Sequence, residues 1–441
     1  MDPSLFEIIS TVIFALAIAH TFLTPTLFHL SEKMSKKKDR EEENSHQWKF
    51  YHFCSEIFYL LSEVEVVFGI WLIPLICFFA LIQGWEQTVE YLDNRNFTHA
   101  LYITVIVVII GSRPIITFSE KILERVARFG KDTPGSWWWT IITLGPLFGA
   151  ILKEPGAMVL SSILLSKKFY PYQPSRLFKY ATLGLLFTNV SVGGMLTTFS
   201  SRSLFIIAYR WDWNWYYMLT HFGWKMIIGL LLSNALYYFL FRKEFKKNFP
   251  ETIRPLKKID EKERPTPFWI TLIHLIFVAL VVISGENAPI FVGIFILFLG
   301  FWSATSFYQA PLHLKSGILV GFFFAALLIH GELQEWWIIP LIERLDYFGA
   351  TITSFILSAL VDNAIVSYMT ADLPQFDTLK HYLVITAAMS AGGLTIMANA
   401  PNVVGHAILR SYFKGSISFL YLFLGALAPS LILLTLFWVF K

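Results

Sequence analysis

The chain has 441 residues, of which 55% are hydrophobic and 15% charged, with a formal net charge of +4. A soluble protein of this size needs more charge to cover its surface, so the composition excludes an ordinary soluble fold. Apolar runs of about 20 residues recur along the chain, each long enough to cross a bilayer as a helix, whereas the short alternating segments typical of a β-barrel do not occur. We therefore expect an all-α polytopic membrane protein.

Charged segments between the apolar runs predict the orientation of the chain. Lysine and arginine concentrate in segments 31–49, 113–136, 167–179 and 242–264, whereas 85–97, 331–348 and 371–379 are acidic or nearly free of them. By the positive-inside rule, the basic segments are cytoplasmic and the acidic segments external. The predicted spans are 5–30, 50–83, 98–112, 180–208 and 215–241 in the first half, and 268–284, 290–308, 316–330, 381–409 and 415–440 in the second.

Two apolar stretches have both flanks on the same side. The stretch 137–166 lies between two basic segments and is interrupted by Gly145-Pro146 and Pro155-Gly156, which break helices. The stretch 349–370 lies between two acidic segments and carries Asp362-Asn363 at its middle. Each stretch is predicted to be a re-entrant hairpin, entering from opposite sides. The alternative is that each is a single kinked span.

Each hairpin is followed by an apolar segment with a polar centre. Segment 180–208 contains Gly193-Gly194 after Ser191, and segment 381–409 contains Gly392-Gly393 after Ser390. Such breaks are tolerated in a membrane only where the backbone lines a cavity or is buried in protein. We therefore expect two broken helices.

The same order of parts in the two halves, with opposite orientation, predicts two inverted repeats. Each repeat would have about five transmembrane helices, one re-entrant hairpin and one broken helix. The first repeat is placed at 1–241, a cytoplasmic basic linker at 242–267, and the second repeat at 268–441. Inverted repeats whose discontinuous helices meet near the midplane are typical of secondary transporters.

A carboxylate occupies the turn of each predicted hairpin, Glu154 in the first and Asp362 in the second. Carboxylates within a membrane are rare and mark ion or proton pathways. A small dehydrated cation prefers oxygen ligands, and since burial disfavours a charged carboxylate, a proton can replace the metal ion there. The predicted cation-binding and proton-coupling residues are Asp362, Asn363, Glu154, Asn189, Ser191, Thr197, Ser390, Thr395 and Asn399, with backbone breaks at Gly193, Gly194, Gly392 and Gly393.

Other interpretations of these acids stay open at this point. The two turns could instead be solvated in a water-filled vestibule, and Lys153 could neutralise its neighbour Glu154. Glu63 and Glu65 lie within a predicted span but on different helix faces. One of them could be a proton relay or make a structural hydrogen bond.

The region 137–410 resembles a family of bacterial sodium/proton antiporters within the ion-transporter superfamily, which also contains arsenite carriers and sodium-coupled dicarboxylate carriers. The resemblance rests on the turn Glu154-Pro155-Gly156-Ala157-Met158, the turn Asp362-Asn363-Ala364 and the run Asn399-Ala400-Pro401-Asn402. It implies a scaffold, a mobile transport region that carries both hairpins, elevator-type alternation and dimerisation. The paired Ser-Asn-Thr motifs of the dicarboxylate branch are replaced here by acidic turns, which favours a cation.

The sequence thus predicts a secondary active transporter that exchanges sodium, or another small monovalent cation, for protons. The alternatives are a sodium-coupled symporter or an anion carrier of the dicarboxylate or arsenite class and, from another class of protein, a channel or a membrane-embedded enzyme. No enzyme motif such as HExxH or GxSxG and no nucleotide-binding loop occurs in the sequence. We expect no cofactor beyond the transported ions, and as partners the lipid bilayer, the cation and a second copy of the chain, but no nucleic acid. The predicted location is the bacterial inner membrane.

Overall fold

The structure is a computed structural model that describes residues 4–250, 265–371, 373 and 375–441. This part of the chain is helical and contains no strand. Six of the described helices are long and apolar enough to span a bilayer, and the bent pair Thr98–Ile110 and Arg113–Gly130 is a seventh candidate. The chain is therefore a polytopic helical membrane protein. The core of the predicted basic linker, 251–264, lies outside the described residues, and so does Asp372 in an acidic segment.

The helices follow the predicted spans closely. Those of the first half are α1 (Leu5–Lys38), α2 (His46–Ser62), α3 (Val64–Gln83), α4 (Trp85–Asp93), α5 (Thr98–Ile110), α6 (Arg113–Ala127), α7 (Pro134–Leu147), α8 (Gly149–Lys168), α9 (Arg176–Gly193), α10 (Arg202–Arg210), α11 (Trp215–Tyr217) and α12 (Trp224–Asn248). Those of the second half are α13 (Phe268–Ile283), α14 (Ala288–Ala304), α15 (Leu314–Glu332), α16 (Glu335–Glu343), α17 (Tyr347–Leu360), α18 (Asn363–Thr370), α19 (Thr378–Ala391), α20 (Pro401–Leu409) and α21 (Phe419–Val439).

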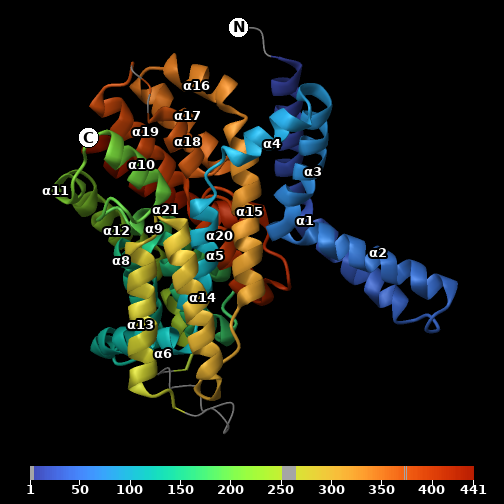
Figure 1. Ribbon diagram of the computed structural model, residues 1–441. Coiled ribbons are helices and arrows are strands. Elements are labelled where there is room, and N and C mark those ends of the chain that lie inside the picture. Colours follow the sequence, from blue (N-terminus) through green and yellow to red (C-terminus); the bar gives the residue numbers. More distant parts are fainter. Residues whose placement is uncertain (1–3, 251–264, 372, 374) are drawn as a thin grey trace.

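Acidic and basic connections gather at opposite ends of the molecule. Helices α4 and α16 lie at one end and α6 at the other (Figure 1). At the α4 end, Arg95 after α4 forms an ion pair with Glu332 at the end of α15. At the α6 end, Ser175 before α9 donates a hydrogen bond of 2.6 Å to Glu244 of α12. This separation is the one that the charge pattern predicts for the two faces of a membrane protein.

The first predicted hairpin is formed by α7 and α8. Trp137 near the start of α7 lies under Lys168 at the end of α8, with 4.5 Å between Nζ and the ring centre. Nearer the turn, a Cβ on Gly145 would come within 2.2 Å of Ser161 Oγ. These contacts show that the two legs run antiparallel. The turn lies around Lys153, whose φ of 60° and ψ of 164° interrupt the helical backbone of α8.

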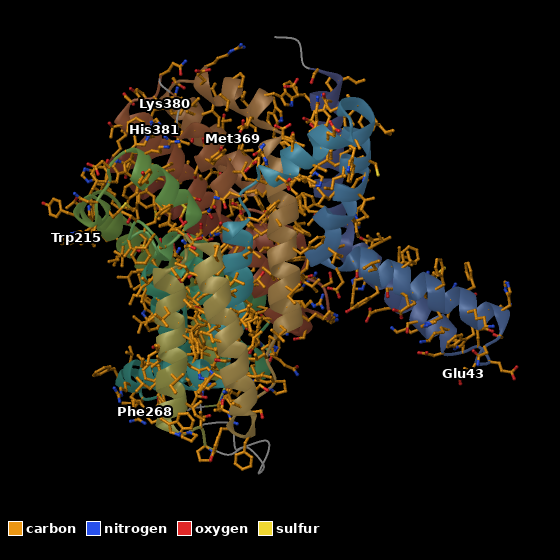
Figure 2. The ribbon with its side chains drawn as sticks, viewed as in Figure 1. Glu43, Trp215, Phe268, Met369, Lys380 and His381 are labelled. Carbon is orange, nitrogen blue, oxygen red and sulfur yellow. The ribbon has the colours of Figure 1, made fainter. Side chains whose placement is uncertain are left out.

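The second predicted hairpin is formed by α17 and α18, with extended backbone at Val361 between them. Tyr347 at the start of α17 donates a hydrogen bond of 2.6 Å to Asp377, seven residues beyond the end of α18. Figure 2 places Met369 near the end of α18 at the same end of the molecule as Lys380, and far from Phe268. The open end of this hairpin therefore lies among the acidic connections, opposite to the open end of the first.

Helices α9 and α19 both end at the Gly-Gly pairs. Helix α9 ends at Gly193 and the next helix begins at Arg202, whereas α19 ends at Ala391 and the next begins at Pro401. The two helices cross at these ends, where a Cβ on Gly393 would lie 2.1 Å from Thr188 Oγ1 and 2.4 Å from the Thr188 backbone nitrogen. Only glycine permits this approach. We name the segments 194–201 and 392–400 the first and second break segments.

One predicted span differs from the structure. The span expected at 50–83 is divided into α2 and α3 by Glu63, whose backbone is extended with φ −76° and ψ 104°. The Glu63 carboxylate forms an ion pair with Arg410 at this break. Helix α2 and the end of α1 project from the bundle as an arm, with Glu43 at its far end (Figures 1 and 2).

Candidate functional site

The turn of the first hairpin buries the carboxylate of Glu154, which is 3% exposed. The Glu154 backbone nitrogen donates to the carbonyl of Ser200 in the first break segment, at 3.0 Å. Its Oε2 accepts a hydrogen bond of 3.1 Å from Asn399 Nδ2 in the second break segment. The other oxygen, Oε1, is buried and has no hydrogen bond of normal geometry from the described residues, although the Ser201 side chain lies against the carboxylate. Glu154 thus contacts both halves of the chain.

Asn363 occupies a comparable place at the turn of the second hairpin. Its backbone nitrogen donates to the carbonyl of Ala398 in the second break segment, at 3.0 Å. Its side chain reaches the first half, where Oδ1 accepts from Ser203 Oγ at 3.2 Å and Nδ2 donates to Ser191 Oγ at 3.3 Å. The side chain of each hairpin turn therefore contacts the broken helix of the opposite half.

The same pair of contacts joins hairpin and break segment in both halves. Thr197 Oγ1 donates to the Ala150 carbonyl at 3.1 Å, and Thr395 Oγ1 donates to the Ala359 carbonyl at 2.7 Å. Ala150 precedes Glu154 by four residues, as Ala359 precedes Asn363. By this register, Glu154 corresponds to Asn363. Lys153 then corresponds to Asp362, so the two acids are not equivalent.

Asp362 has both carboxylate oxygens engaged by backbone. Oδ1 accepts from the Ala364 nitrogen at 2.8 Å and so caps the start of α18, and Oδ2 accepts from the Ala400 nitrogen at 2.7 Å. A carboxylate held by two N–H groups of this kind fixes the local backbone. Asp362 therefore connects the second hairpin turn to the end of the second break segment.

The remaining predicted ligands divide into two groups. Ser191 lies at the crossing of the broken helices, where its hydroxyl donates to the Met389 carbonyl at 2.8 Å. Asn189 points instead toward α7 and α12, donating to the Ile142 carbonyl and to Asn234 Oδ1. Ser390 donates to the Thr386 carbonyl within its own helix. Glu154, Asn363, Asn399 and Ser191 are thus brought together, whereas the side chains of Asn189 and Ser390 are bound elsewhere.

The backbone carbonyls next to the second glycine pair are also satisfied. Asn402 Nδ2 donates to the carbonyls of Gly392, at 2.6 Å, and Thr395, at 2.8 Å. This amide holds the second break segment in a fixed shape. The sequence predicts that backbone carbonyls freed at the glycine pair face the ion site. For the other carbonyls of the second break segment, this stays a prediction.

Lys153 does not neutralise Glu154 in this conformation. Its Nζ lies 2.9 Å from Oε1 of Glu286, in the α13–α14 connection, and 4.6 Å from the ring centre of Tyr102 in α5. Lys153 and Ser201 line a cavity of about 360 Å³ whose other residues include Glu286 and Glu332. The cavity therefore connects the acidic end of the molecule to residues on either side of the Glu154 site.

A second cavity, of about 690 Å³, lies toward the basic end. Its walls include Val107 of α5, Val159 of α8, Val320 of α15 and Val404 of α20. Both cavities thus follow the boundary between α5 and α15 on one side and the hairpin and broken helices on the other. One lies toward the acidic end of the molecule and the other toward the basic end.

The sequence did not single out Ser203 or Glu286. Ser203 lies two residues beyond the first break segment, and its hydroxyl is one of the two from the first half that contact Asn363. Ser201 follows Thr197 by four residues, as Asn399 follows Thr395. An alignment of the two halves of the sequence could therefore have pointed to the stretch that contains Ser203. Glu286 gives no local signal, because its partner Lys153 is 133 residues away in the chain.

One carboxylate, two amides and hydroxyls from both halves of the chain lie together at this place. A model of the family described as "Putative Na+/H+ antiporter" matches residues 5–440. The chain belongs to this family. The family is one of transporters, not of enzymes, and its antiport of sodium and protons agrees with a buried carboxylate among neutral oxygen ligands. No curated protein matches the chain.

Proposed function

We propose that the protein is a secondary active transporter that exchanges sodium, or another small monovalent cation, for protons. One observation carries the proposal. Glu154 is a buried carboxylate with an unengaged oxygen at the point where two hairpin turns and two break segments meet. A carboxylate in such a place is a functional group by default, because an isolated charge there is costly.

Four hydrogen bonds arrange the proposed site as a closed ring. Glu154 binds the Ser200 carbonyl, Ser203 binds Asn363, Asn363 binds the Ala398 carbonyl, and Asn399 next to Ala398 binds Glu154. The first hairpin turn is therefore held by both break segments, and the second by the second break segment and by Ser203, just beyond the first. A cation at Glu154 Oε1 would draw on the amide oxygens and hydroxyls of this ring, which are the hard ligands that such ions prefer.

The exchange follows from competition for one carboxylate. Burial requires a positive partner for the Glu154 charge, and either a metal ion or a proton satisfies that requirement. Since both cannot occupy the carboxylate together, uptake of one requires release of the other. Asp362 is a positioning residue in this account, and its charge adds to the negative potential of the site.

Elevator-type alternation is part of the proposal. The matched threonine and backbone contacts in the two halves support an inverted repeat, and inverted repeats alternate by motion of one unit against another. The two cavities lie along one boundary, as expected if α8 and α20 move against α5 and α15. In a bacterial inner membrane, the cavity next to Lys153 would face the outside.

Transport by the purified protein in proteoliposomes tests the function. A sodium gradient should drive proton movement, reported by an enclosed pH dye, and lithium should substitute better than potassium if the site is small. Succinate and arsenite, added without a change in cation, should leave the signal unchanged. Sodium-dependent uptake of labelled succinate without proton exchange would contradict antiport and favour the symporter alternative.

A further inference from the structure

The cavity of about 690 Å³ toward the basic end has apolar walls at its inner part. Val107 of α5, Val159 of α8 and Val404 of α20 line it and are almost fully buried. Ile163 and Ala407 extend the same apolar lining along α8 and α20. Sites for small molecules have volumes of this order, with apolar walls and a few polar groups. The cavity therefore has the size and the lining of a site for a molecule with an apolar body.

The walls differ from those of the cavity of about 360 Å³ at the acidic end. That cavity is lined by Lys153, Glu286 and Glu332 together with amide and hydroxyl side chains, which hydrate an ion path. Among the described residues that line the basic-end cavity, none belongs to a hairpin turn or to a break segment. Valine and isoleucine side chains offer an ion no ligand, and an apolar cavity gives water few hydrogen bonds. An alkyl chain fits this space better than an ion does.

Charged side chains form the mouth of the basic-end cavity. Lys167 is 43% exposed, and His313 and Arg113 are also accessible, whereas the valines of the walls are buried. Glu120 is the one carboxylate among the described lining residues, and its Oε1 lies 2.6 Å from Nζ of Lys168, outside the lining. The mouth therefore carries more positive than negative charge and favours an anionic group.

Helix α6 places this mouth at the surface of the membrane. It begins at Arg113, lies at the basic end of the bundle (Figure 1) and is bent by 71° from α5. Ile116 and Leu123 are buried, whereas Lys121 and Arg125 on the same helix are exposed. This pattern is typical of a helix that lies among lipid headgroups. By the positive-inside rule the basic end is cytoplasmic, and the cytoplasmic leaflet contains anionic phospholipids.

We propose that this cavity binds an anionic phospholipid of the cytoplasmic leaflet. The phosphate lies at the mouth with Arg113 and Lys167, and one acyl chain fills the space between α5 and α15 on one side and α8 and α20 on the other. Basic pockets between membrane helices on the cytoplasmic side recognise phospholipid headgroups in this way. The chain gains an apolar lining, and the phosphate stays at the level of the other headgroups.

Photolabelling locates the chain. The protein is reconstituted with phosphatidylglycerol that carries a diazirine in one acyl chain, and labelled peptides are identified by mass spectrometry. We expect label at cavity residues such as Val159, Ile163 and Val404, suppressed by excess unlabelled phosphatidylglycerol but not by phosphatidylcholine. Val159 and Val404 are too buried for chains of the surrounding bilayer to reach. Label confined to exposed side chains such as Ile296 and Leu297 of α14 would overturn the proposal.

Substitutions at the mouth and in the wall test the two parts of the site. Arg113→Gln and Lys167→Gln should each raise the phosphatidylglycerol content at half-maximal labelling about fivefold, as expected for one cation near the headgroups. Ala407→Phe should reduce labelling of the cavity about tenfold, because its ring displaces several methylene groups of the chain. Arg125→Gln is the matched control, since Arg125 is exposed on α6 but does not line the cavity.

The mouth variants decide the test even if Ala407→Phe does not fold. Half-maximal labelling at the wild-type lipid content in both mouth variants would overturn the proposal. Oleate and glycerol 3-phosphate are added as competitors, because a fatty acid and a soluble phosphate meet parts of the same chemistry. Suppression of the label by either of them at a lower concentration than by phosphatidylglycerol would contradict the assignment to a phospholipid.

The consequence for transport rests on the exchange function proposed above. Since α8 and α20 belong to the unit proposed to move, we expect the bound chain to hold it against α5 and α15. Sodium-driven proton flux should then be about tenfold lower at ten times the half-saturating phosphatidylglycerol content, because only the lipid-free protein moves. An unchanged rate at saturated labelling would overturn this coupling. Photolabelling needs no transport, so a labelled cavity without any flux would reject the exchange function alone.

Discussion

Three side chains with similar sequence signals have different roles in the structure. Glu154, Asp362 and Lys153 all lie at hairpin turns, but their partners differ. Glu154 has an oxygen that accepts no hydrogen bond of normal geometry within the part of the chain that the structure describes, Asp362 binds two backbone nitrogens, and Lys153 binds Glu286. The chemistry of exchange requires a carboxylate that can release one positive partner for another. Glu154 meets this requirement, and Asp362 is too firmly engaged by backbone to be the first choice.

Substitutions at Asp362 test this division of roles. Asp362→Asn keeps one acceptor oxygen for two N–H donors, so sodium binding should persist while the thermal midpoint falls. Asp362→Ala removes the cap of α18 as well, which costs about 0.5–2 kcal/mol for a helix N-cap. Thermal unfolding and sodium binding are measured on the same samples. If Asp362→Asn abolished binding at unchanged stability, Asp362 would be a direct ligand and the assignment would be wrong.

At the scale of elements, the fold depends on close approach where helices end. Helices α9 and α19 can cross because Gly393 has no side chain to meet Thr188, and Gly392 likewise faces Ser191. The break segments that follow are fixed by side chains such as Thr197, Thr395 and Asn402. The site is therefore made of segments whose shape is set by packing and not by helix hydrogen bonds.

Gly393→Ala tests the crossing. The new methyl group would meet the backbone of Thr188, which cannot rotate away, so we expect destabilisation in the range of about 1–3 kcal/mol for overpacking, with loss of transport. Gly293→Ala is the control, because a Cβ there meets nothing within 4 Å and alanine suits a helix interior. Unfolding midpoints in detergent compare the two. Equal midpoints would show that the helices do not cross as closely as described.

Much of the element order was accessible from the sequence because its signals are local. Glycine and proline pairs marked the first hairpin, Asp362-Asn363 marked the second, glycine pairs marked the helix breaks, and lysine and arginine marked the connections at one end. The division of 50–83 at Glu63 was missed, because no local signal marks it and Arg410, the partner of Glu63, lies 347 residues further along the chain. Whether a carboxylate oxygen has a hydrogen-bond partner depends on how distant segments of the backbone pack around it, and a local sequence pattern does not show this.

At the scale of the whole molecule, the two halves pack against each other along the bundle, with α3 and α5 against α15 and with α9 and α12 against α21, and their hairpin turns and broken helices meet at the Glu154 site. The first hairpin opens toward the basic end and the second toward the acidic end, with their turns joined at the Glu154 site. One cavity, lined by Lys153 and Ser201, lies beside this region toward the acidic end, and another lies along the same boundary toward the basic end. That arrangement suits a carrier, in which access to one central site alternates between the two sides of the membrane.

Proton release on sodium binding tests the central claim most directly. Purified protein in a weakly buffered detergent solution is mixed with sodium chloride, a pH dye records released protons, and radioactive sodium records binding. Metal ions bind the deprotonated ligand. At a pH at which the site is still protonated before sodium is added, the wild type should therefore release up to about one proton per bound ion. Glu154→Gln should release none, whereas Asp362→Asn should resemble the wild type. Proton release by Glu154→Gln equal to that of the wild type would contradict the account.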